Sequence, residues 1–538
     1  MHRALLIAEI VEMMCSHLRV RSTKNDQSDD SGDSDNDDQQ ALEGRRSLVA
    51  LASTCKALRA PALDAFWKEQ DSIIPWLSCF PEDLFNIRPV LATEEDPLLL
   101  ERPFAIDDWR LSDLNAARVE RLTFEYDAGL GEIFKALSIA FPFGSLFPRL
   151  RSLSWTSICE EDFIHIRVLL TPGLSSIAVT YEPSAINCSI LSTLTRTCPR
   201  LVEVDVRIPA ESLSGCIGID EPSLTSNSQF VQSLSHVKSL SMPTVSRAAI
   251  FHIGRLPDLA FLRIRNMFGY ELPYLREDDH EPRTFFRDLR ALHLPWLDIE
   301  TAIQLIQMGS QFQLETLEFG WNDPLSRDEM EELYNLLAKS CSHTSLVDLI
   351  FDGFVRSTAP NPDNAINDRL LQILFCFHNL TRFSFTSPEP FDLCDTTLTD
   401  AARAWPRLET FELALLSYSP HRPSKLTMQS LYAFAQHCPG LRFLHIQVDA
   451  TNPCTMIWHP RASPPPQLTL TELCIAHSDI CPSAVNAIAG VIFTVFPNLR
   501  TITGPSLWRL KGKDFERRGE LWKKVEGLLS EFAPARSR

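Results

Sequence analysis

The sequence predicts an α/β protein in which a helical N-terminal domain precedes an irregular solenoid of strand–helix repeats. Two observations predict this fold. A short apolar phrase recurs about fourteen times from Val119 onward, and the stretches between its copies have helical spacing. A chain of 538 residues suits either three to four compact domains or one elongated array of the same mass. The recurrence favours the array.

The N-terminal domain, residues 1–70, is predicted from two amphipathic helices, Ala4–Leu18 and Ser47–Ala60. Apolar residues lie along one side of each helix, at three- and four-residue spacing. In the first helix these residues are Leu6, Ile7, Ile10, Met13, Met14 and Leu18. In the second helix they are Leu48, Leu51, Ala52, Cys55 and Leu58. Two such short helices need more apolar partner surface than they can give each other.

An acidic insert, residues 21–45, separates these two helices. Its stretch Asp26–Asp38 holds seven Asp in thirteen residues and no apolar side chain, so it is predicted to be disordered. The simplest interpretation is a solvated loop. Alternatively, Ser34, with Asp35 and Asp37 behind it, is a substrate for an acid-directed kinase, and a phosphate there would deepen the local negative charge.

The repeat array is predicted over residues 117–505, after a linker or capping helices at residues 71–116. Each copy of the phrase has an aliphatic residue, two variable residues, a second apolar residue, one variable residue and a third apolar residue. The first aliphatic residue, here called the anchor, recurs about every 29 residues between Val119 and Leu499. The last two apolar residues alternate with exposed ones, which predicts a short strand in each copy.

Helices are predicted between the strands, for example over Asp328–Ser340, Asp368–Phe377, Thr399–Trp405 and Met428–His437. Several are followed by Cys-Pro or Phe-Pro, which predicts the helix end because Pro cannot continue the hydrogen-bond ladder. One strand and one helix cannot bury their apolar faces alone, whereas a stack of such pairs can. The expected result is a curved solenoid with strands on the concave side and helices on the convex side.

The C-terminal segment, residues 506–538, is predicted to form a basic amphipathic helix and tail. Its stretch Trp508–Gly527 mixes basic residues with two Trp and one Phe. The simplest interpretation is a polar cap that closes the last repeat. Contact with a membrane or a partner is the alternative.

The array resembles the leucine-rich repeat family over roughly residues 117–505. The phrase and its rhythm carry the resemblance, in copies such as FPRLRSLSW, CPRLVEVDV and CPGLRFLHI. The resemblance implies a leucine-rich-repeat-like solenoid of irregular repeat length. An irregular α/β domain whose strands carry the same phrase is the alternative.

The N-terminal residues resemble the F-box, and more narrowly the large group of fungal F-box proteins. The carriers are AEIVEMMCSHL from Ala8, SLVALASTCKALRAPALDAFWKEQ from Ser47 and IIPWLSCFPEDLF from Ile73. The resemblance implies a small helical bundle that docks on a Skp1-like protein through the apolar residues of the two helices, and so joins a cullin-based ubiquitin ligase. Leucine-rich repeats are one of the standard substrate-binding domains of that family.

Composition argues against several functional classes. A net charge of −18 disfavours binding to nucleic acid or membrane, which needs a concentrated positive field. The fourteen Cys include no C-x-x-C pair, so they are interpreted as buried residues of a cytoplasmic or nuclear protein. The common nucleotide-binding, metalloprotease and nucleophile-elbow motifs do not occur. We therefore expect neither an enzyme nor a cofactor.

The candidate recognition surface is the concave side of the array, where the variable residue between the last two apolar positions is predicted to be exposed. This stripe comprises Thr123, Ser154, Asp205, Ser241, Arg263, His293, Glu318, Ser384, Glu412 and His445. Its mixture of signs suits specific protein recognition. Arg207, Arg263 and Arg265 are predicted to form a small cationic patch for a phosphate or carboxylate, with unconnected surface arginines as the alternative.

Together these features predict a non-catalytic adaptor. Residues 4–70 are expected to bind a Skp1-like protein, and residues 117–505 are expected to bind an unknown target protein that is to be ubiquitinated. The alternative is a leucine-rich-repeat interaction scaffold that belongs to no ligase.

Overall fold

The structure, a computed structural model, divides into two compact units, Met1–Val237 (unit 1) and Lys238–Arg538 (unit 2). Both units are α/β, and in both the strands of the main sheet follow one another in chain order. The predicted fold class is confirmed at this level. The structure describes residues 8–18, 34–85, 100–125, 130–141, 145–157, 161–209, 221–265, 285–296, 298–309, 311–321, 325–353, 362–415, 424–451, 466–475, 478–503 and 513–532.

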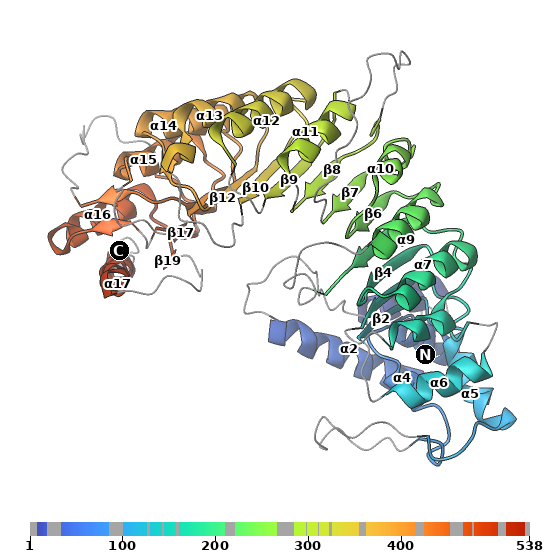
Figure 1. Cartoon of the computed structure of the whole chain (residues 1–538). Helices are drawn as coiled ribbons and strands as arrows, with labels where there is room; N and C mark the ends of the chain where they lie inside the picture. The colour runs from blue at the N-terminus through green and yellow to red at the C-terminus, as the bar shows by residue number, and fades with distance from the viewer. Residues whose placement is uncertain are drawn as a thin grey trace. The chain divides into compact units, whose positions relative to one another are not determined.

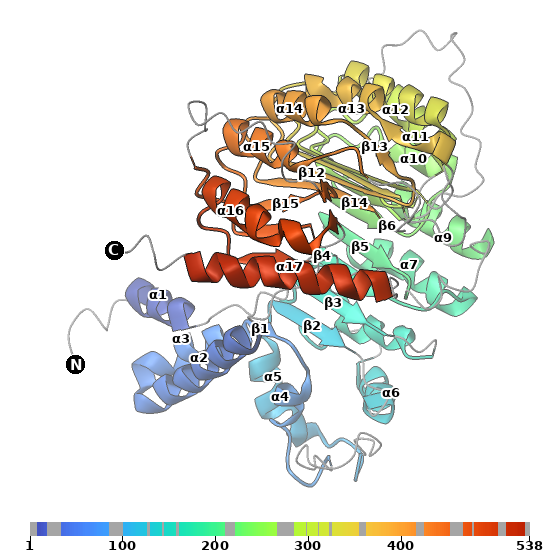
Figure 2. The same ribbon diagram turned by 90° about the vertical axis from the view of Figure 1, so that its left-hand side faces the viewer.

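Three helices form a bundle at the start of unit 1: α1 (Ala8–Leu18), α2 (Ser34–Thr54) and α3 (Lys56–Trp67) (Figure 2). They enclose a small core of Val11, Cys15, Leu48, Leu58 and Ala62. Half-buried residues of all three helices pack against it. A helical bundle therefore lies where the sequence predicts helices, with a core of its own.

Two boundaries of these helices differ from the predictions. Helix α2 begins at Ser34, so the prediction of disorder over residues 21–45 is wrong for residues 34–45, while residues 21–33 lie outside the described residues. The acidic composition that suggested disorder also suits the first turn of a helix, whose N-terminal end is positive. The sequence pattern alone did not separate these two cases.

The prediction of one helix over Ser47–Ala60 is also wrong, because the chain is extended at Cys55, with φ −158° and ψ 162°. The hydroxyls of Ser53 and Thr54 donate to main-chain carbonyls one turn earlier, over 2.9 and 2.7 Å. Such bonds compete for the acceptors at the end of α2. Helix α3 then starts afresh and continues through Pro61.

The main sheet of unit 1 has five strands. They are β1 (Glu69–Gln70), β2 (Arg121–Glu125), β3 (Ser152–Thr156), β4 (Ser176–Thr180) and β5 (Glu203–Arg207). The sheet therefore starts with β1, before the predicted start of the array at residue 117. Beside β1, the carbonyl of Lys68 accepts the N–H groups of Glu120 and Arg121, which joins this segment to β2. The helices of unit 1 beyond the bundle are α4 (Ile74–Leu77), α5 (Trp109–Ala116), α6 (Gly131–Ala140), α7 (Ala185–Thr197) and α9 (Glu221–Gln232).

The main sheet of unit 2 has ten strands. They are β6 (Ser239–Met242), β7 (Phe261–Ile264), β8 (Ala291–Leu294), β9 (Thr316–Trp321), β10 (Asp348–Gly353), β12 (Arg382–Ser387), β14 (Thr410–Leu415), β15 (Phe443–His445), β17 (Glu472–Cys474) and β19 (Thr501–Thr503). Two small parallel pairs lie beside it: β11 (Ile366–Asn367) with β13 (Phe391–Asp392), and β16 (Asp449–Ala450) with β18 (Asp479–Ile480).

The anchors of the repeat phrase fix the position of every main-sheet strand from β2 onward. Each of these strands begins two residues after its anchor. Every anchor is at most 9% exposed, and the set comprises Val119, Leu150, Leu174, Leu201, Val237, Leu259, Leu289, Leu314, Leu346, Leu380, Leu408, Leu441, Leu470 and Leu499. The predicted repeat phrase is thus confirmed as the unit of the fold, because its apolar positions are the core of successive turns.

Helices line one face of the unit 2 sheet (Figure 1). They are α10 (Arg247–Ile253), α11 (Ile299–Met308), α12 (Arg327–Ser340), α13 (Asp368–Ile373), α14 (Asp395–Ala404), α15 (Met428–His437) and α16 (Val485–Val495). The prediction for α15 is confirmed at both ends, and α12 starts one residue earlier than predicted. Helix α14 begins at Asp395 rather than Thr399, and the predicted helix at Asp368 continues from α13 as a short 3-10 turn, Leu374–Cys376.

Local signals set the ends of these helices. Side-chain oxygens of Ser184, Ser246, Asp298, Ser326 and Asn367 each accept the N–H three residues later, which caps an exposed helix start. At the other end, the last residue of α7, α14, α15 and α16 stands directly before an X-Pro pair. The predicted Pro stops are therefore confirmed.

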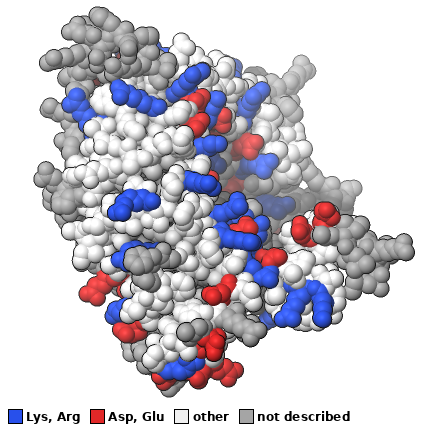
Figure 3. All heavy atoms as spheres, turned by 90° about the vertical axis from the view of Figure 1, so that its right-hand side faces the viewer, with Lys and Arg blue, Asp and Glu red and all other residues white. Residues whose placement is uncertain are grey.

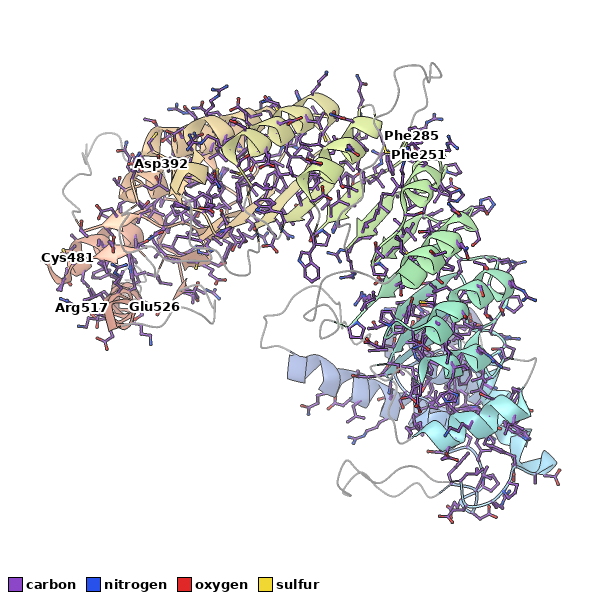
Figure 4. The ribbon with its side chains drawn as sticks, in the orientation of Figure 1. Phe251, Phe285, Asp392, Cys481, Arg517 and Glu526 are labelled. Carbon is purple, nitrogen blue, oxygen red and sulfur yellow. The ribbon has the colours of Figure 1, made fainter. Side chains whose placement is uncertain are left out.

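Helix α17 (Lys513–Phe532) covers the last strands of unit 2, beside α16 (Figure 2). Its Leu521, Trp522, Val525 and Leu529 are buried. Glu526, labelled in Figure 4, accepts the main-chain N–H of Ile502 in β19 over 3.2 Å. The helix thus closes the sheet edge, in agreement with the interpretation of this segment as a cap.

Aromatic pairs fill the junctions between successive repeats. Phe251 of α10 meets Phe285 with 5.8 Å between ring centroids (Figure 4). Further along unit 2, Phe383 stacks on both Trp405 and Phe411, at 4.8 and 5.5 Å. These contacts join each turn to the next, so the sheet is held by packing as well as by its hydrogen bonds.

Candidate functional site

Strand register aligns the central residues of successive strands into one row across unit 2. This polar row comprises Ser241, Arg263, His293, Glu318, Ile350, Ser384, Glu412, His445, Cys474 and Thr503. The described residues on either side of each row member are buried, and helices line one face of this sheet (Figure 1). Side chains alternate between the two faces of a sheet, so the row occupies the face opposite those helices.

Glu318 is the centre of the first cluster in the row. Its Oε2 lies 3.1 Å from Nη2 of Arg263 and 2.7 Å from Nδ1 of His293. Burial acts to raise the pKa of Glu318, but His293 and Arg263 outweigh it and hold that pKa below its ordinary value. The carboxylate therefore stays ionised between two basic groups.

Glu412 is the centre of the second cluster. Its Oε2 accepts a hydrogen bond from Ser384 Oγ at 2.7 Å, and its Oε1 lies 3.1 Å from Nδ1 of His445. Burial acts to raise the pKa of Glu412, but the bonds from His445 and Ser384 lower it. Burial acts to lower the pKa of His445, but hydrogen bonds and charges of Cys474 and Glu412 outweigh it and raise that pKa to about 9.

The second cluster contains the residue types of a hydrolytic triad in a different order. In such a triad the histidine stands between the hydroxyl and the carboxylate, so that it can take the hydroxyl proton. Here Glu412 stands between Ser384 and His445. The imidazole is therefore bonded to the carboxylate and not to the Ser384 hydroxyl, which is not the order of such a triad.

The structure corrects the predicted exposure of the two histidines. His293 and His445 are each only 8% exposed. Neighbouring strands in a sheet are about 4.8 Å apart, so the side chains of adjacent row members cover the imidazoles on both sides. Ion pairs between row members on neighbouring strands thus bury the side chains of these two histidines.

The predicted cationic patch is also corrected. Arg263 is bound to Glu318 in unit 2. Arg207, in unit 1, is bound to Asp205 two residues earlier on β5, at 2.6 Å. Arg265 follows β7 and its N–H donates to the carbonyl of Met242. Asp205 neutralises Arg207, because residues two apart on a strand share one face, and Glu318 neutralises Arg263 from another strand.

The predicted docking residues of the N-terminal bundle fall into three groups. Leu48 and Leu58 lie in the bundle core, which corrects the expectation that they contact a partner directly. Ile10, Leu18, Leu51, Ala52 and Cys55 are half-buried, whereas Met13 and Met14 are 55% and 41% exposed. Leu6 and Ile7 lie outside the described residues.

The sequence pattern missed two further exposed apolar residues of the bundle, Leu42 and Val49, each 49% exposed on α2. They are seven residues apart, about two helical turns, and therefore share one face. Their spacing was available in the sequence, but the acidic stretch beside Leu42 concealed the start of the helix. Met13, Met14, Leu42 and Val49 are called the apolar bundle surface below.

Within the described ranges, no helix is long and apolar enough to cross a membrane. The same part of the chain contains no group of His, Cys, Asp and Glu side chains arranged to hold a metal ion.

The raised pKa of His445 makes a testable prediction about pH. A folded-state pKa of about 9 exceeds the ordinary value of 6.5, so the contribution of His445 is fully present below pH 6.5 and is lost as pH rises through 9. We expect His445→Gln to lower the thermal midpoint more at pH 6 than at pH 9.5. An equal loss at both pH values would show that the imidazole is neutral in the folded protein.

No protein-family model matches the chain, and no curated protein matches its sequence. Among solved structures, the chain is similar to a chain in the crystal structure of the Rad7 and Elc1 complex of yeast, with a TM-score of 0.29 and 13% sequence identity. The similarity covers 72% of this chain and 85% of that chain.

Proposed function

We propose that the protein is a non-catalytic adaptor of a Skp1–cullin–F-box ubiquitin ligase. In this proposal the N-terminal bundle docks a Skp1-like protein, and through it a cullin, while the repeats bind a target protein. The observation that carries the proposal is the apolar bundle surface. Four of the nine large apolar side chains exposed in the described residues lie on α1 and α2.

The bundle does not need this surface for its own stability. Its core of five buried residues is enclosed by the three helices, and the exposed side chains point away from it. Large apolar side chains exposed outside a closed core support an interaction site on the bundle. Helix faces of this kind dock against apolar partner surfaces, which agrees with the F-box resemblance of the segments that hold Met13, Met14 and Val49.

The polar row supports the second half of the proposal. Its charged groups are held by one another before any partner arrives, because Glu318 and Glu412 each join two row members. Groups fixed in this way lose little conformational freedom on binding. A row with both charge signs favours a partner of complementary pattern, and therefore a specific protein target.

We place the adaptor in the cytoplasm or nucleus, where a Skp1-like partner and a reducing environment are both expected. Eleven cysteines in the described residues are unpaired, and the pKa of buried Cys438 and Cys341 is raised to about 12 by burial. Thiols of high pKa react slowly, which suits cysteines that serve as small apolar core residues.

The docking test replaces Met13 and Val49 by Asp in one variant. Fully burying an apolar side chain of this size contributes roughly 1.5–3 kcal/mol, so two lost contacts should weaken binding to a Skp1-like protein about a hundredfold or more. The measurement is titration calorimetry of the full chain with a Skp1-like protein from the same organism. The matched control is Ile139→Asp with Ile186→Asp, because these residues are 80% and 63% exposed in unit 1 outside the bundle.

Three outcomes separate the hypotheses. Loss of binding in the bundle variant alone supports the adaptor. Wild-type affinity in that variant would show that the apolar bundle surface is not the docking site. A wild-type chain that binds no Skp1-like protein would leave the repeat scaffold outside any ligase as the function.

A further inference from the structure

Unit 1 contains a groove of about 620 Å³ along the edge where its strands begin. It is lined by Glu120, Arg149, Arg151, Gly173, Ser175 and Arg200, with Pro148 and Val202. All of these residues flank the anchors that precede β2, β3, β4 and β5. The groove is therefore a product of the repeat, and it is distinct from both the polar row and the apolar bundle surface.

The groove is built from two parallel rows of residues. The residues that follow the anchors, Glu120, Arg151, Ser175 and Val202, are joined by main-chain bonds of 2.8, 2.8 and 2.7 Å from each N–H to the carbonyl one strand earlier. The residues that precede the anchors are Arg149, Gly173 and Arg200. The ladder fixes the main chain of the row that follows the anchors, and the residues that precede the anchors lie two positions before it in the chain.

Gly173 keeps the space between Arg149 and Arg200 open. A Cβ there would have only ordinary contacts, with Thr171 Oγ1 at 3.7 Å and the Leu150 carbonyl at 3.9 Å. The glycine is thus not required by the backbone, yet it leaves a gap between two arginines. Neighbouring strands are about 4.8 Å apart, so the main chains at 149 and 200 are separated by roughly 10 Å, which suits a ligand held between them.

Among the described residues, the three arginines of the groove have no charged partner. Arg149, Arg151 and Arg200 are exposed, and no other described side chain forms an ion pair or a hydrogen bond with their guanidinium groups. The one carboxylate that lines the groove, Glu120, lies 3.4 Å from Lys68 Nζ. In contrast, Arg207 and Arg263 of the predicted cationic patch each have an acidic neighbour. The groove thus concentrates positive charge in a chain whose net charge is −18.

We propose that this groove binds a phosphorylated segment of a partner protein, with one phosphoserine or phosphothreonine between Arg149 and Arg200. A phosphate monoester carries close to two negative charges and three acceptor oxygens, so a single group can engage two guanidinium forks. A carboxylate has one charge and would leave the other arginines uncompensated. The groove crosses only the start of four strands, which favours one concentrated anion over a run of separate carboxylates.

The charge distribution disfavours nucleic acid as the occupant. A polyanion needs an extended positive field along its length. On the face drawn in Figure 3, basic and acidic side chains are interspersed and most of the surface is uncharged. Binding of a phosphopeptide depends on the local groove and needs no such field.

The test uses the full chain and a fluorescein-labelled degenerate peptide pool with one fixed central phosphoserine. Fluorescence anisotropy should show saturable binding to the wild type, and Arg149→Gln with Arg151→Gln should weaken it at least tenfold. The matched control is Arg407→Gln with Arg442→Gln in unit 2. These two arginines precede and follow their anchors as Arg149 and Arg151 do, so the change in net charge and the repeat positions are the same. The control should stay within twofold of the wild type.

Four results would overturn the inference. They are absence of binding by the wild type, equal weakening in groove and control variants, equal affinity for a pool with Glu in place of phosphoserine, and displacement of the peptide by single-stranded RNA at lower concentration than by inorganic phosphate. The third would show a site for acidic peptides in general, and the fourth a nucleic-acid site. All substituted arginines are exposed, and unchanged melting of each variant would confirm that the fold is intact.

Discussion

Leu48→Asp is expected to unfold the N-terminal bundle while unit 2 stays folded. Leu48 is 1% exposed and packs in the core with Val11, Cys15, Leu58 and Ala62. An unpaired carboxylate in that position costs about 4 kcal/mol or more, a loss that so small a core cannot absorb. Hydrogen exchange should become fast throughout α1, α2 and α3, with protection of the unit 2 strands unchanged.

Val49→Asp is the matched control for this substitution. It introduces the same charge one residue away on the same helix, where the side chain is 49% exposed. We expect protection of the bundle to stay near the wild-type level, because a surface substitution usually changes stability by less than about 0.5 kcal/mol. Equal loss of protection in both variants would contradict the arrangement of the bundle core. The pair also separates a folding defect from a docking defect at this helix.

Gly320→Ala is expected to destabilise unit 2 by about 3 kcal/mol or more, which is large for the addition of one methyl group. Gly320 lies in β9 opposite Asp352 of β10. On its other side, β8 ends at Leu294, and a Cβ at position 320 would overlap the carbonyl oxygen of Pro295. Backbone cannot move aside as a side chain can, so β8 and β9 must separate. Urea unfolding followed by Trp fluorescence measures the loss.

Gly490→Ala provides the opposite expectation within the same unit. Gly490 lies inside α16, and a Cβ there has no neighbouring atom within 4 Å. Alanine favours the helix over glycine by up to about 1 kcal/mol, so this variant should be as stable as the wild type or slightly more stable. A destabilisation by Gly320→Ala no greater than that by Gly490→Ala would show that β8 and β9 do not approach as closely as described.

The repeat phrase predicted most of the fold because its signal is local and repeated. Leu408 and Leu441, for example, are each followed after two residues by a strand, and each is fully buried. The helix ends were predictable where Pro follows, as at α15 and α16. Helix starts were less certain, since the cap at Ser326 and the acidic first turn of α2 depend on which neighbouring hydrogen bonds form.

The candidate site was predictable as a row and unpredictable in its chemistry. The sequence by itself determined which residues share the face, because a phrase with one variable residue between two apolar ones places that residue opposite the core on every turn. Which charges meet depends on contacts between residues far apart in the chain, 33 positions for Glu412 and His445 and 55 for Arg263 and Glu318. Only the tertiary structure could therefore decide that Glu318 holds Arg263 and His293, and that Glu412 holds His445. It also decided that Arg149, Arg151 and Arg200 meet no acidic side chain within the described part of the chain. Pairing across strands is fixed by register and side-chain reach, and neither is encoded in the residues of one repeat alone.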